Sequence, residues 1–250
     1  MTAVDLSRPP FTADWSQRFT FGSAAPVSRI QGICIHTTEN DFTGSAEGVA
    51  NYQIRNRSSY HVLVDASGRR LRCNTDDWTA WATGNRGNDV LLHLAFVARA
   101  RFTRQQWLGQ DALLRSGARY MAHWCHVHRI PVTALTPSQL RSGARGITTH
   151  DGTRIAWGGT DHTDPGAGFP MDVVTRYIRE YMAGTPAGPI KSGDDMTPDQ
   201  ARKLDYIYGQ LGPWPQLGTN DKGQPLTLVD ALARLRADLD ELLGMLGRLD

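Results

Sequence analysis

Three short segments of the chain carry side chains that could bind a metal ion. His36 and His150 each end a short β-type run, and residues 158–166 form a glycine-rich loop with His162 and Asp164. Polar residues that follow buried strands commonly lie at the functional edge of an α/β sheet. Two imidazoles and a carboxylate are ligands that zinc accepts, and three protein ligands leave a fourth position open for water. These residue types indicate a catalytic metal site.

The remaining histidines are less promising as metal ligands. His123, His126 and His128 lie late in one helical pattern, and a single helix does not easily close a tetrahedral site with these spacings. We interpret them as a helix end, where the helix dipole favours cations. His93 lies inside an apolar run and is expected to be a hydrogen-bonded core histidine, and His61 is expected to belong to a strand.

The elements that must position these residues alternate between strand and helix patterns. Apolar and β-branched runs predict strands, and three- and four-residue apolar spacing predicts helices. The mixture predicts an α/β fold with a single central mixed β-sheet flanked by helices. The predicted strands are residues 30–36, 60–64, 71–73, 90–97 and 146–150, with the second and third forming a hairpin. The predicted helices are 45–54 (helical spacing at Val49, Tyr52 and Gln53), 103–128 and 170–182.

A Gly/Pro-rich segment, residues 184–195, is typical of an exposed linker. It divides a domain at 1–183 from a small C-terminal helical region at 196–250. In that region we predict a helix after Thr197, a break over 212–225, and a second helix that Thr227 caps.

The second C-terminal helix carries leucines at alternating steps of four and three. Such a heptad stripe is typical of a coiled coil, although packing within a helical hairpin is the alternative. We favour a homo-oligomer through residues 228–249. The stripe comprises Leu228, Leu232, Leu235, Leu239, Leu242, Leu246 and Leu249.

Composition excludes several classes of protein. The 250 residues carry a formal net charge of +2, which does not suggest a nucleic-acid partner. No apolar run approaches the ~18 residues of a membrane span, and residues 1–16 lack the apolar core of a signal peptide. We expect synthesis in the cytoplasm without membrane insertion. The three widely spaced cysteines predict free thiols rather than disulfides.

The ordered set of motifs resembles a known enzyme family. It consists of His36-Thr-Thr, the 59–68 segment SYHVLVDASG, the 81–84 segment WATG, His150, and the 162–166 segment HTDPG. In this order they resemble the zinc N-acetylmuramoyl-L-alanine amidases related to peptidoglycan recognition proteins, especially endolysins of phages that infect actinobacteria. The set is more specific than any single motif.

The resemblance extends over residues 19–182 and implies roles for individual residues. His36, His150 and Asp164 would bind Zn²⁺. His162 stands where relatives commonly have a lysine that steadies the tetrahedral intermediate, and Tyr60 would lie beside the metal.

Two departures from the family pattern affect these roles. Many relatives carry a glutamate in the central strand, and here Ala95 stands in its place. Either Glu39 takes over this role or zinc alone activates the water. His162 could also replace Asp164 as the third ligand, but we favour Asp164 because the motif places it there.

The resemblance implies hydrolysis of the amide between N-acetylmuramic acid and L-alanine in peptidoglycan, for lysis of a bacterial host after a separate holin permeabilises the membrane. A polymeric substrate needs a groove, for which we predict Asn40, Trp81, Asn85 and Trp157, with Trp78 as a further candidate. The alternatives are a non-catalytic peptidoglycan-binding module and a virion-associated structural protein. The resemblance also leaves open that residues 196–250 target the cell wall instead of joining copies of the chain.

Overall fold

The computed structural model describes residues 5–184, 214–219 and 225–246. The chain divides into two compact units, Met1–Pro189 and Ile190–Asp250. The linker predicted at 184–195 and the helix predicted after Thr197 lie almost wholly outside the described residues, so these domain boundaries stay predictions.

The first unit is built on one six-stranded sheet with the order β1-β4-β3-β5-β2-β6. The β3–β4 pair is antiparallel, as predicted for a hairpin, and all other neighbours are parallel. The mixed central sheet confirms the predicted fold class. The strands are β1 (Ala13–Asp14), β2 (Gly32–Thr37), β3 (Val62–Val64), β4 (Arg70–Arg72), β5 (Leu91–Phe96) and β6 (Gly146–Thr149).

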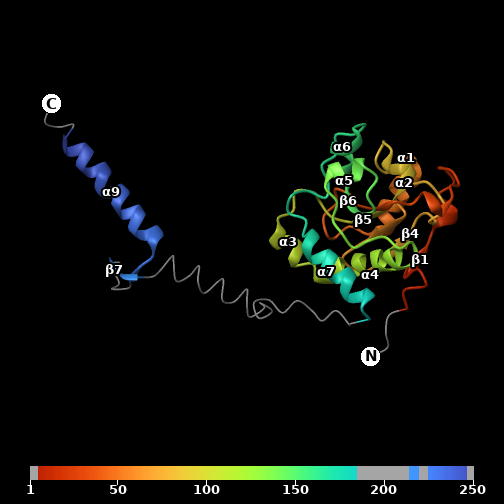
Figure 1. Cartoon of the computed structure of the whole chain (residues 1–250), viewed down its shortest axis with the longest axis horizontal. Helices are drawn as coiled ribbons and strands as arrows, with labels where there is room; N and C mark the ends of the chain where they lie inside the picture. Colours follow the sequence, from red (N-terminus) through yellow and green to blue (C-terminus); the bar gives the residue numbers. More distant parts are fainter. Residues whose placement is uncertain (1–4, 185–213, 220–224, 247–250) are drawn as a thin grey trace. The chain divides into compact units, whose positions relative to one another are not determined.

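Helices cover both faces of this sheet. α4 and α7 lie on one side, and α1, α5 and α6 lie on the other (Figure 1). Short 3₁₀ turns at Ser16–Arg18 and Val27–Arg29 precede β2. The helices are α1 (Ala46–Asn56), α2 (Gly87–Val90), α3 (Arg104–Leu108), α4 (Asp111–Val127), α5 (Pro137–Arg141), α6 (His150–Trp157) and α7 (Met171–Met182).

The central strands β2 and β5 are buried along their whole length. Parallel strands covered on both faces are expected to be continuously apolar, and this explains why their runs do not alternate. Helix α4 packs closely on β5, since a Cβ atom at Gly117 of α4 would collide with the Phe96 ring of β5. The opposite face of the same strands carries Cys34, His36 and His93, so these three side chains share one side of the sheet.

Two helix predictions need correction. The helix predicted over 103–128 is two helices, because Thr103 and Gln106 form a capping box for a separate short helix that ends at Gly109. Glycine disfavours continuation of a helix, and α4 starts again at Asp111. In α1, the spacing of Val49, Tyr52 and Gln53 does not mark the buried face, because Tyr52 is 59% exposed. The buried stripe consists of Ala46, Ala50 and Gln53.

The C-terminal unit contains β7 (Trp214–Thr219), β8 (Pro225–Leu226) and α9 (Leu228–Leu246). The antiparallel β7–β8 pair replaces the loop predicted there. Thr227 caps α9 as predicted, since its Oγ1 accepts a hydrogen bond from Asp230 N at 3.2 Å. Leu232, Leu235 and Leu239 are more than half exposed. Leu249 lies outside the described residues.

Two simpler predictions can also be compared with the structure. Within the described ranges, no helix is long and apolar enough to cross a membrane. Cys34, Cys73 and Cys125 are free and buried, as predicted.

Candidate metal centre and cleft

Three separate elements bring His36, His150 and Asp164 together. His36 lies near the carboxyl end of β2, and His150 begins α6 directly after β6. Because β2 and β6 are parallel neighbours, their ends meet at the same sheet edge. Thr149 caps α6 by accepting a hydrogen bond from Gly152 N, and this fixes where the helix begins.

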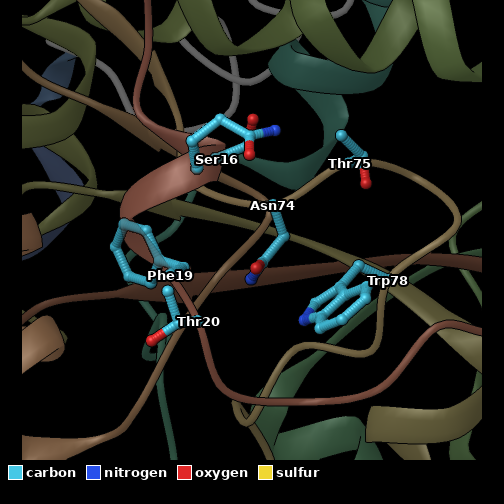
Figure 2. Close-up of a pocket in the computed structure, with 7 residues that line it drawn as sticks. Ser16, Phe19, Thr20, Asn74, Thr75 and Trp78 are labelled. Carbon is cyan, nitrogen blue, oxygen red and sulfur yellow. The ribbon is translucent and has the colours of Figure 1, made fainter.

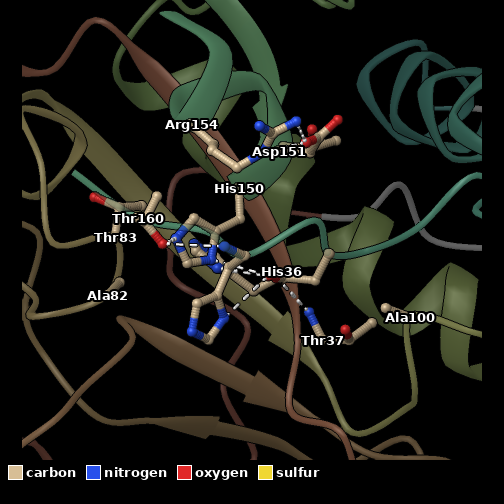
Figure 3. A network of polar contacts seen from close by, with 12 residues as sticks. His36, Thr37, Ala82, Thr83, Ala100, His150, Asp151, Arg154 and Thr160 are labelled. Atoms are coloured by element: carbon tan, nitrogen blue, oxygen red, sulfur yellow. Dashed lines mark hydrogen bonds and ion pairs between the residues drawn. The ribbon is translucent and has the colours of Figure 1, made fainter. Parts of the chain in front are cut away.

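The loop that carries Asp164 is held by backbone contacts on both sides. Asp151 N donates to the Asp164 carbonyl at 3.1 Å, and Thr37 N donates to Asp164 Oδ2 at 3.1 Å (Figure 3). Gly166 adopts a φ of +83° and lies against Ala100, where a Cβ atom would collide with the carbonyl oxygen. The glycine of the DPG motif is therefore needed for the close approach that places Asp164.

The three ligand atoms converge on a small volume. Asp164 Oδ2 lies 3.3 Å from His36 Nδ1, and Asp164 Oδ1 lies 2.9 Å from His150 Nδ1. All three atoms lie within 4.8 Å of one another. The residues are almost completely buried, with exposed fractions of 0%, 4% and 5% for His36, His150 and Asp164.

The electrostatics of the cluster favour a carboxylate beside neutral imidazole. Burial raises the pKa of Asp164, but the adjacent imidazoles of His150 and His36 outweigh burial and hold the pKa well below its ordinary value. Burial lowers the pKa of His36, and the Asp164 carboxylate opposes this only in part. A deprotonated carboxylate and neutral imidazole are the forms that bind metal ions.

These residues fit a zinc ion. His36 Nδ1 is buried and has no hydrogen-bond partner, although it faces a carboxylate oxygen. A buried nitrogen and a carboxylate oxygen that face each other without a hydrogen bond leave a place that a cation can fill. Two imidazole nitrogens and one carboxylate oxygen are a common donor set of catalytic zinc sites with an open position.

A second possible triad, Cys34, His36 and His93, shares His36 but fits a metal less well. His93 Nδ1 is only 3.0 Å from His36 Nε2, and His93 Nε2 lies 3.1 Å from Gly87 O. Both His93 nitrogens are thus engaged in hydrogen bonds. Burial raises the pKa of the Cys34 thiol well above its ordinary value, and this disfavours the thiolate form that metals require.

Each metal-facing histidine has a partner for its second nitrogen. His150 Nε2 lies 3.3 Å from Thr160 Oγ1, and His36 Nε2 contacts His93. Outer partners of this kind orient metal-binding imidazoles. The sequence reasoning missed Thr160 and missed the contact of His93 with the site. His93 reaches His36 because the register between β2 and β5 pairs His93 with Cys34, two residues before His36. The sequence carried no signal for this register.

His162 and Tyr60 border the cluster from two sides. The His162 ring stacks on His150 with centroids 4.9 Å apart, its Nδ1 is 3.7 Å from Asp164 Oδ1, and 64% of its side chain is exposed. The half-buried Tyr60 ring lies 4.8 Å from the His36 ring. Burial and the nearby Asp164 raise the pKa of Tyr60, so its hydroxyl keeps its proton and can donate a hydrogen bond.

An open cleft of about 400 Å³ leads to this cluster. Its wall comes from α1, the segment between α1 and β3, residues 81–88, the start of α6 and residues 159–162. Trp81, predicted to bind substrate, is 41% exposed and belongs to this wall. The lining residues include Gln53, Ser58, Tyr60, Trp81, Thr83, Asn88, His150, Thr160 and His162.

The other predicted substrate residues lie outside this lining. Asn85 Nδ2 donates to Gly158 O at 2.8 Å, so it ties two loops of the wall together. Trp157 packs against a core cluster, and Asn40 is exposed after β2. Their contact with substrate stays a prediction.

Glu39 lies two residues after β2 and is occupied by local contacts. Its Oε1 accepts hydrogen bonds from Thr37 Oγ1 at 2.7 Å and Ala100 N at 3.0 Å. Ala95 is buried and pairs in register with His36 on the neighbouring strand.

Trp78 lines a separate hollow of about 350 Å³ (Figure 2). Its indole Nε1 donates to Phe21 O at 2.8 Å, and the neighbouring Asn74 Nδ2 donates to Tyr60 O at 2.9 Å. These polar groups hold loops in place, so we assign Trp78 a structural role.

Comparisons with known proteins are consistent with this architecture. The structure of the Staphylococcus aureus hydrolase AmiA in complex with its ligand is 22% identical, with a TM-score of 0.55, and the match covers 70% of this chain and 83% of that chain. A weaker likeness is the endolysin N-acetylmuramoyl-L-alanine amidase LysCS from Clostridium intestinale, which is 12% identical with a TM-score of 0.44; the match covers 69% of this chain and 98% of that chain. Another is the PlyG catalytic domain, which is 16% identical with a TM-score of 0.45; the match covers 74% of this chain and 97% of that chain. The comparison with curated proteins found no match.

Two family descriptions match the sequence itself. The C-terminal description, named the Rv3766 C-terminal domain, matches residues 196–242. The N-terminal description is N-acetylmuramoyl-L-alanine amidase, and it matches residues 26–167, which is more than half of the chain and contains every residue of the candidate centre. The chain therefore belongs to the N-acetylmuramoyl-L-alanine amidase family.

Proposed function

We propose that this protein is a zinc-dependent N-acetylmuramoyl-L-alanine amidase that hydrolyses the bond between N-acetylmuramic acid and L-alanine in peptidoglycan. The observation that carries the proposal is the convergence of His36 Nδ1, His150 Nδ1 and Asp164 at the end of an open cleft. These three residues would hold the ion. When bound, zinc supplies a Lewis acid that polarises the scissile carbonyl and lowers the pKa of a water molecule toward about 7.

Residues of the chain itself would stabilise the charge that develops on the carbonyl oxygen. Tyr60 keeps its hydroxyl proton and can donate a hydrogen bond to this oxygen. The exposed His162 stands beside the cluster, where it can serve as a second donor. Donors that are fixed before the reaction stabilise the transition state more than flexible water does.

The departing amine of L-alanine must receive a proton when the C–N bond breaks. His162 is suited to this step because its imidazole lines the cleft, lies beside the cluster and is exposed, and imidazoles are common general acids. Glu39 was the other candidate, but its Oε1 already accepts two hydrogen bonds. We therefore propose His162 as the proton donor and Glu39 as a residue that supports the loop.

The first experiment measures the release of free amino groups from purified cell walls. We expect release that a chelator abolishes and that added Zn²⁺ restores. Asp164→Ala should lose both the bound zinc and the activity. The main alternative, a non-catalytic peptidoglycan-binding module, predicts wall binding without release, so absence of release from zinc-loaded protein would contradict the enzyme.

The biological role that we propose is lysis of a bacterial host by a phage endolysin. Its support is the resemblance of the motif set to endolysins of phages that infect actinobacteria. Applied to intact walls of such bacteria, the protein should lower turbidity, and the Asp164→Ala variant should not. A virion-associated structural role would instead leave the wild-type protein without lytic effect.

We further propose that α9 joins copies of this chain into a homo-oligomer. Leu232, Leu235 and Leu239 are more than half exposed on this helix, and leucines at this spacing are typical of coiled coils. Light scattering of the full chain should give a multiple of 27.6 kDa. Leu235→Lys should give the monomer mass, and Ala237→Lys, off the stripe, should not. A monomeric wild type that still binds walls through residues 196–250 would favour targeting instead.

A further inference from the structure

His93 is a fully buried histidine that contacts a candidate zinc ligand from the side opposite the ion. It lies on β5, next to β2, and its Nδ1 is 3.0 Å from His36 Nε2. Its other ring nitrogen, Nε2, lies 3.1 Å from the carbonyl oxygen of Gly87. Both His36 and His93 have no exposed surface, so water does not compete for these contacts.

The Gly87 carbonyl determines which His93 nitrogen carries the proton. A carbonyl oxygen only accepts hydrogen bonds, so His93 Nε2 must be the N–H group. The groups that face His93 are the imidazoles of His36 and His61, the Cys34 thiol and this carbonyl. Among the described residues, no carboxylate contacts His93 to compensate a second proton. A buried cation without a counter-charge is costly, so Nδ1 is an acceptor.

The same reasoning then fixes the tautomer of His36. An acceptor at His93 Nδ1 requires a proton on His36 Nε2. The lone pair of His36 is left on Nδ1, which is the buried atom without a hydrogen-bond partner and which lies 3.3 Å from Asp164 Oδ2. A chain of two hydrogen bonds thus runs from Gly87 through His93 to the metal-facing nitrogen.

We propose that His93 is a positioning residue for the zinc centre, which holds His36 in the tautomer and ring orientation that present Nδ1 to the ion. This inference rests on the proposed zinc function. The backbone of His93 is held in place as well, because His93 N donates a hydrogen bond to His61 Nδ1 at 3.0 Å. Partners of this kind typically change metal affinity by about 10- to 100-fold when they are removed.

Two substitutions separate hydrogen bonding from packing. His93→Gln offers an oxygen that can accept from His36 Nε2 and an amide N–H that can reach Gly87 O. His93→Leu fills similar space without either bond. A matched control is His123→Leu, which removes a buried histidine whose Nδ1 contacts Leu6 O instead of the centre.

The first measurement is zinc affinity by competition with a chelator. We expect His93→Leu to bind zinc about 10- to 100-fold more weakly, and His93→Gln and His123→Leu to stay near wild type. Thermal unfolding of the metal-free proteins checks that each variant is folded. A folded His93→Leu with unchanged zinc affinity overturns the inference.

The second measurement needs no metal and no variant. Two-dimensional ¹⁵N NMR of the imidazole rings in the metal-free wild-type protein should assign the proton of His36 to Nε2 and that of His93 to Nε2. A proton on His36 Nδ1 overturns the inference even if His93→Leu fails to fold. Absence of zinc binding by wild type, combined with the expected tautomers, would instead contradict the proposed function and leave the hydrogen-bond chain intact.

Discussion

Two neighbouring clusters of histidine, aspartate and aromatic residues differ in how their polar atoms are satisfied. The open cluster consists of His36, His150, His162 and Asp164, and the closed cluster consists of His61, Asp76, Trp124 and His128. In the closed cluster, Asp76 accepts from Trp124 Nε1 at 3.1 Å and pairs with His128 Nε2 at 2.7 Å. His61 Nε2 contacts Trp78 O, and its Nδ1 accepts from His93 N.

In the open cluster, by contrast, not every polar atom has a hydrogen-bond partner. His36 Nδ1 has no hydrogen-bond partner, and 64% of the His162 side chain is exposed to the cleft. Native proteins satisfy nearly all buried polar groups, so an unpaired nitrogen that faces a carboxylate calls for an explanation, and a bound ion is one. The comparison indicates that the closed cluster stabilises the fold, whereas the open cluster keeps nitrogen atoms available for an ion and a substrate. Substitutions should therefore affect folding in one cluster and turnover in the other.

The largest effect on turnover among the following substitutions is expected from His162→Ala. This change removes a proposed hydrogen-bond donor and proton donor but none of the three proposed ligands. We expect kcat to fall by about 10²–10³-fold while zinc content and the thermal unfolding midpoint stay near wild type. Steady-state release of amino groups together with metal analysis tests this.

Loss of zinc from His162→Ala would mean that His162, rather than Asp164, is the third ligand. That alternative was open from the sequence, because both residues lie in the same loop. The buried position of Asp164, with its two contacts to His36 and His150, favours the assignment made here.

A smaller effect on turnover is expected from Tyr60→Phe. The hydroxyl is lost but the ring that packs 4.8 Å from His36 remains. We expect kcat to fall roughly tenfold, the equivalent of one ordinary hydrogen bond, because His162 remains as a donor. KM and the zinc content should change little. A kcat equal to that of wild type would remove Tyr60 from the proposed mechanism.

Much of the first unit could be predicted because local patterns carried the information. Apolar runs located β2 and β5, a short β-type run located β6, and the motif order pointed to the residues of the open cluster. The break in the helix at Gly109 was missed because a capping box around Thr103 competes with a continuous helical spacing. The position of Asn85 between two loops of the cleft wall was also missed, because side-chain contacts of that kind depend on tertiary packing.

The role of His93 shows most clearly what could not be predicted from the sequence. The sequence correctly indicated a hydrogen-bonded core histidine, but its partner depends on the register between β2 and β5. Register follows from packing across the whole sheet and turn geometry, not from either strand alone. His93 therefore joins the two clusters in a way that only the folded structure reveals.

Glu39→Gln should behave like a substitution in the closed cluster, although Glu39 lies close to the open one. A glutamine oxygen can accept the same bonds from Thr37 Oγ1 and Ala100 N. We expect turnover near the wild-type value, measured by amino-group release across a range of pH. A large loss of kcat with an altered pH profile would instead identify Glu39 as the substitute for the missing strand glutamate.

The smallest effect on turnover is expected from Asp76→Asn, which should lower stability instead. Burial raises the pKa of Asp76, but the contacts with His128, His61 and Trp124 outweigh it and leave the pKa below its ordinary value. At neutral pH the substitution should therefore lower the free energy of unfolding by about 1–3 kcal/mol, the usual effect of weakening hydrogen bonds to a partly buried charge. Because the folded-state pKa is depressed, this contribution is complete above the ordinary aspartate pKa of about 3.9 and disappears as pH falls through the lower folded-state value. Urea unfolding of both proteins at neutral and acid pH measures the difference, which should shrink in acid, while zinc affinity and kcat at neutral pH stay unchanged. A variant that kept its stability but lost turnover would show that the closed cluster serves catalysis, and the division between the two clusters would then be wrong.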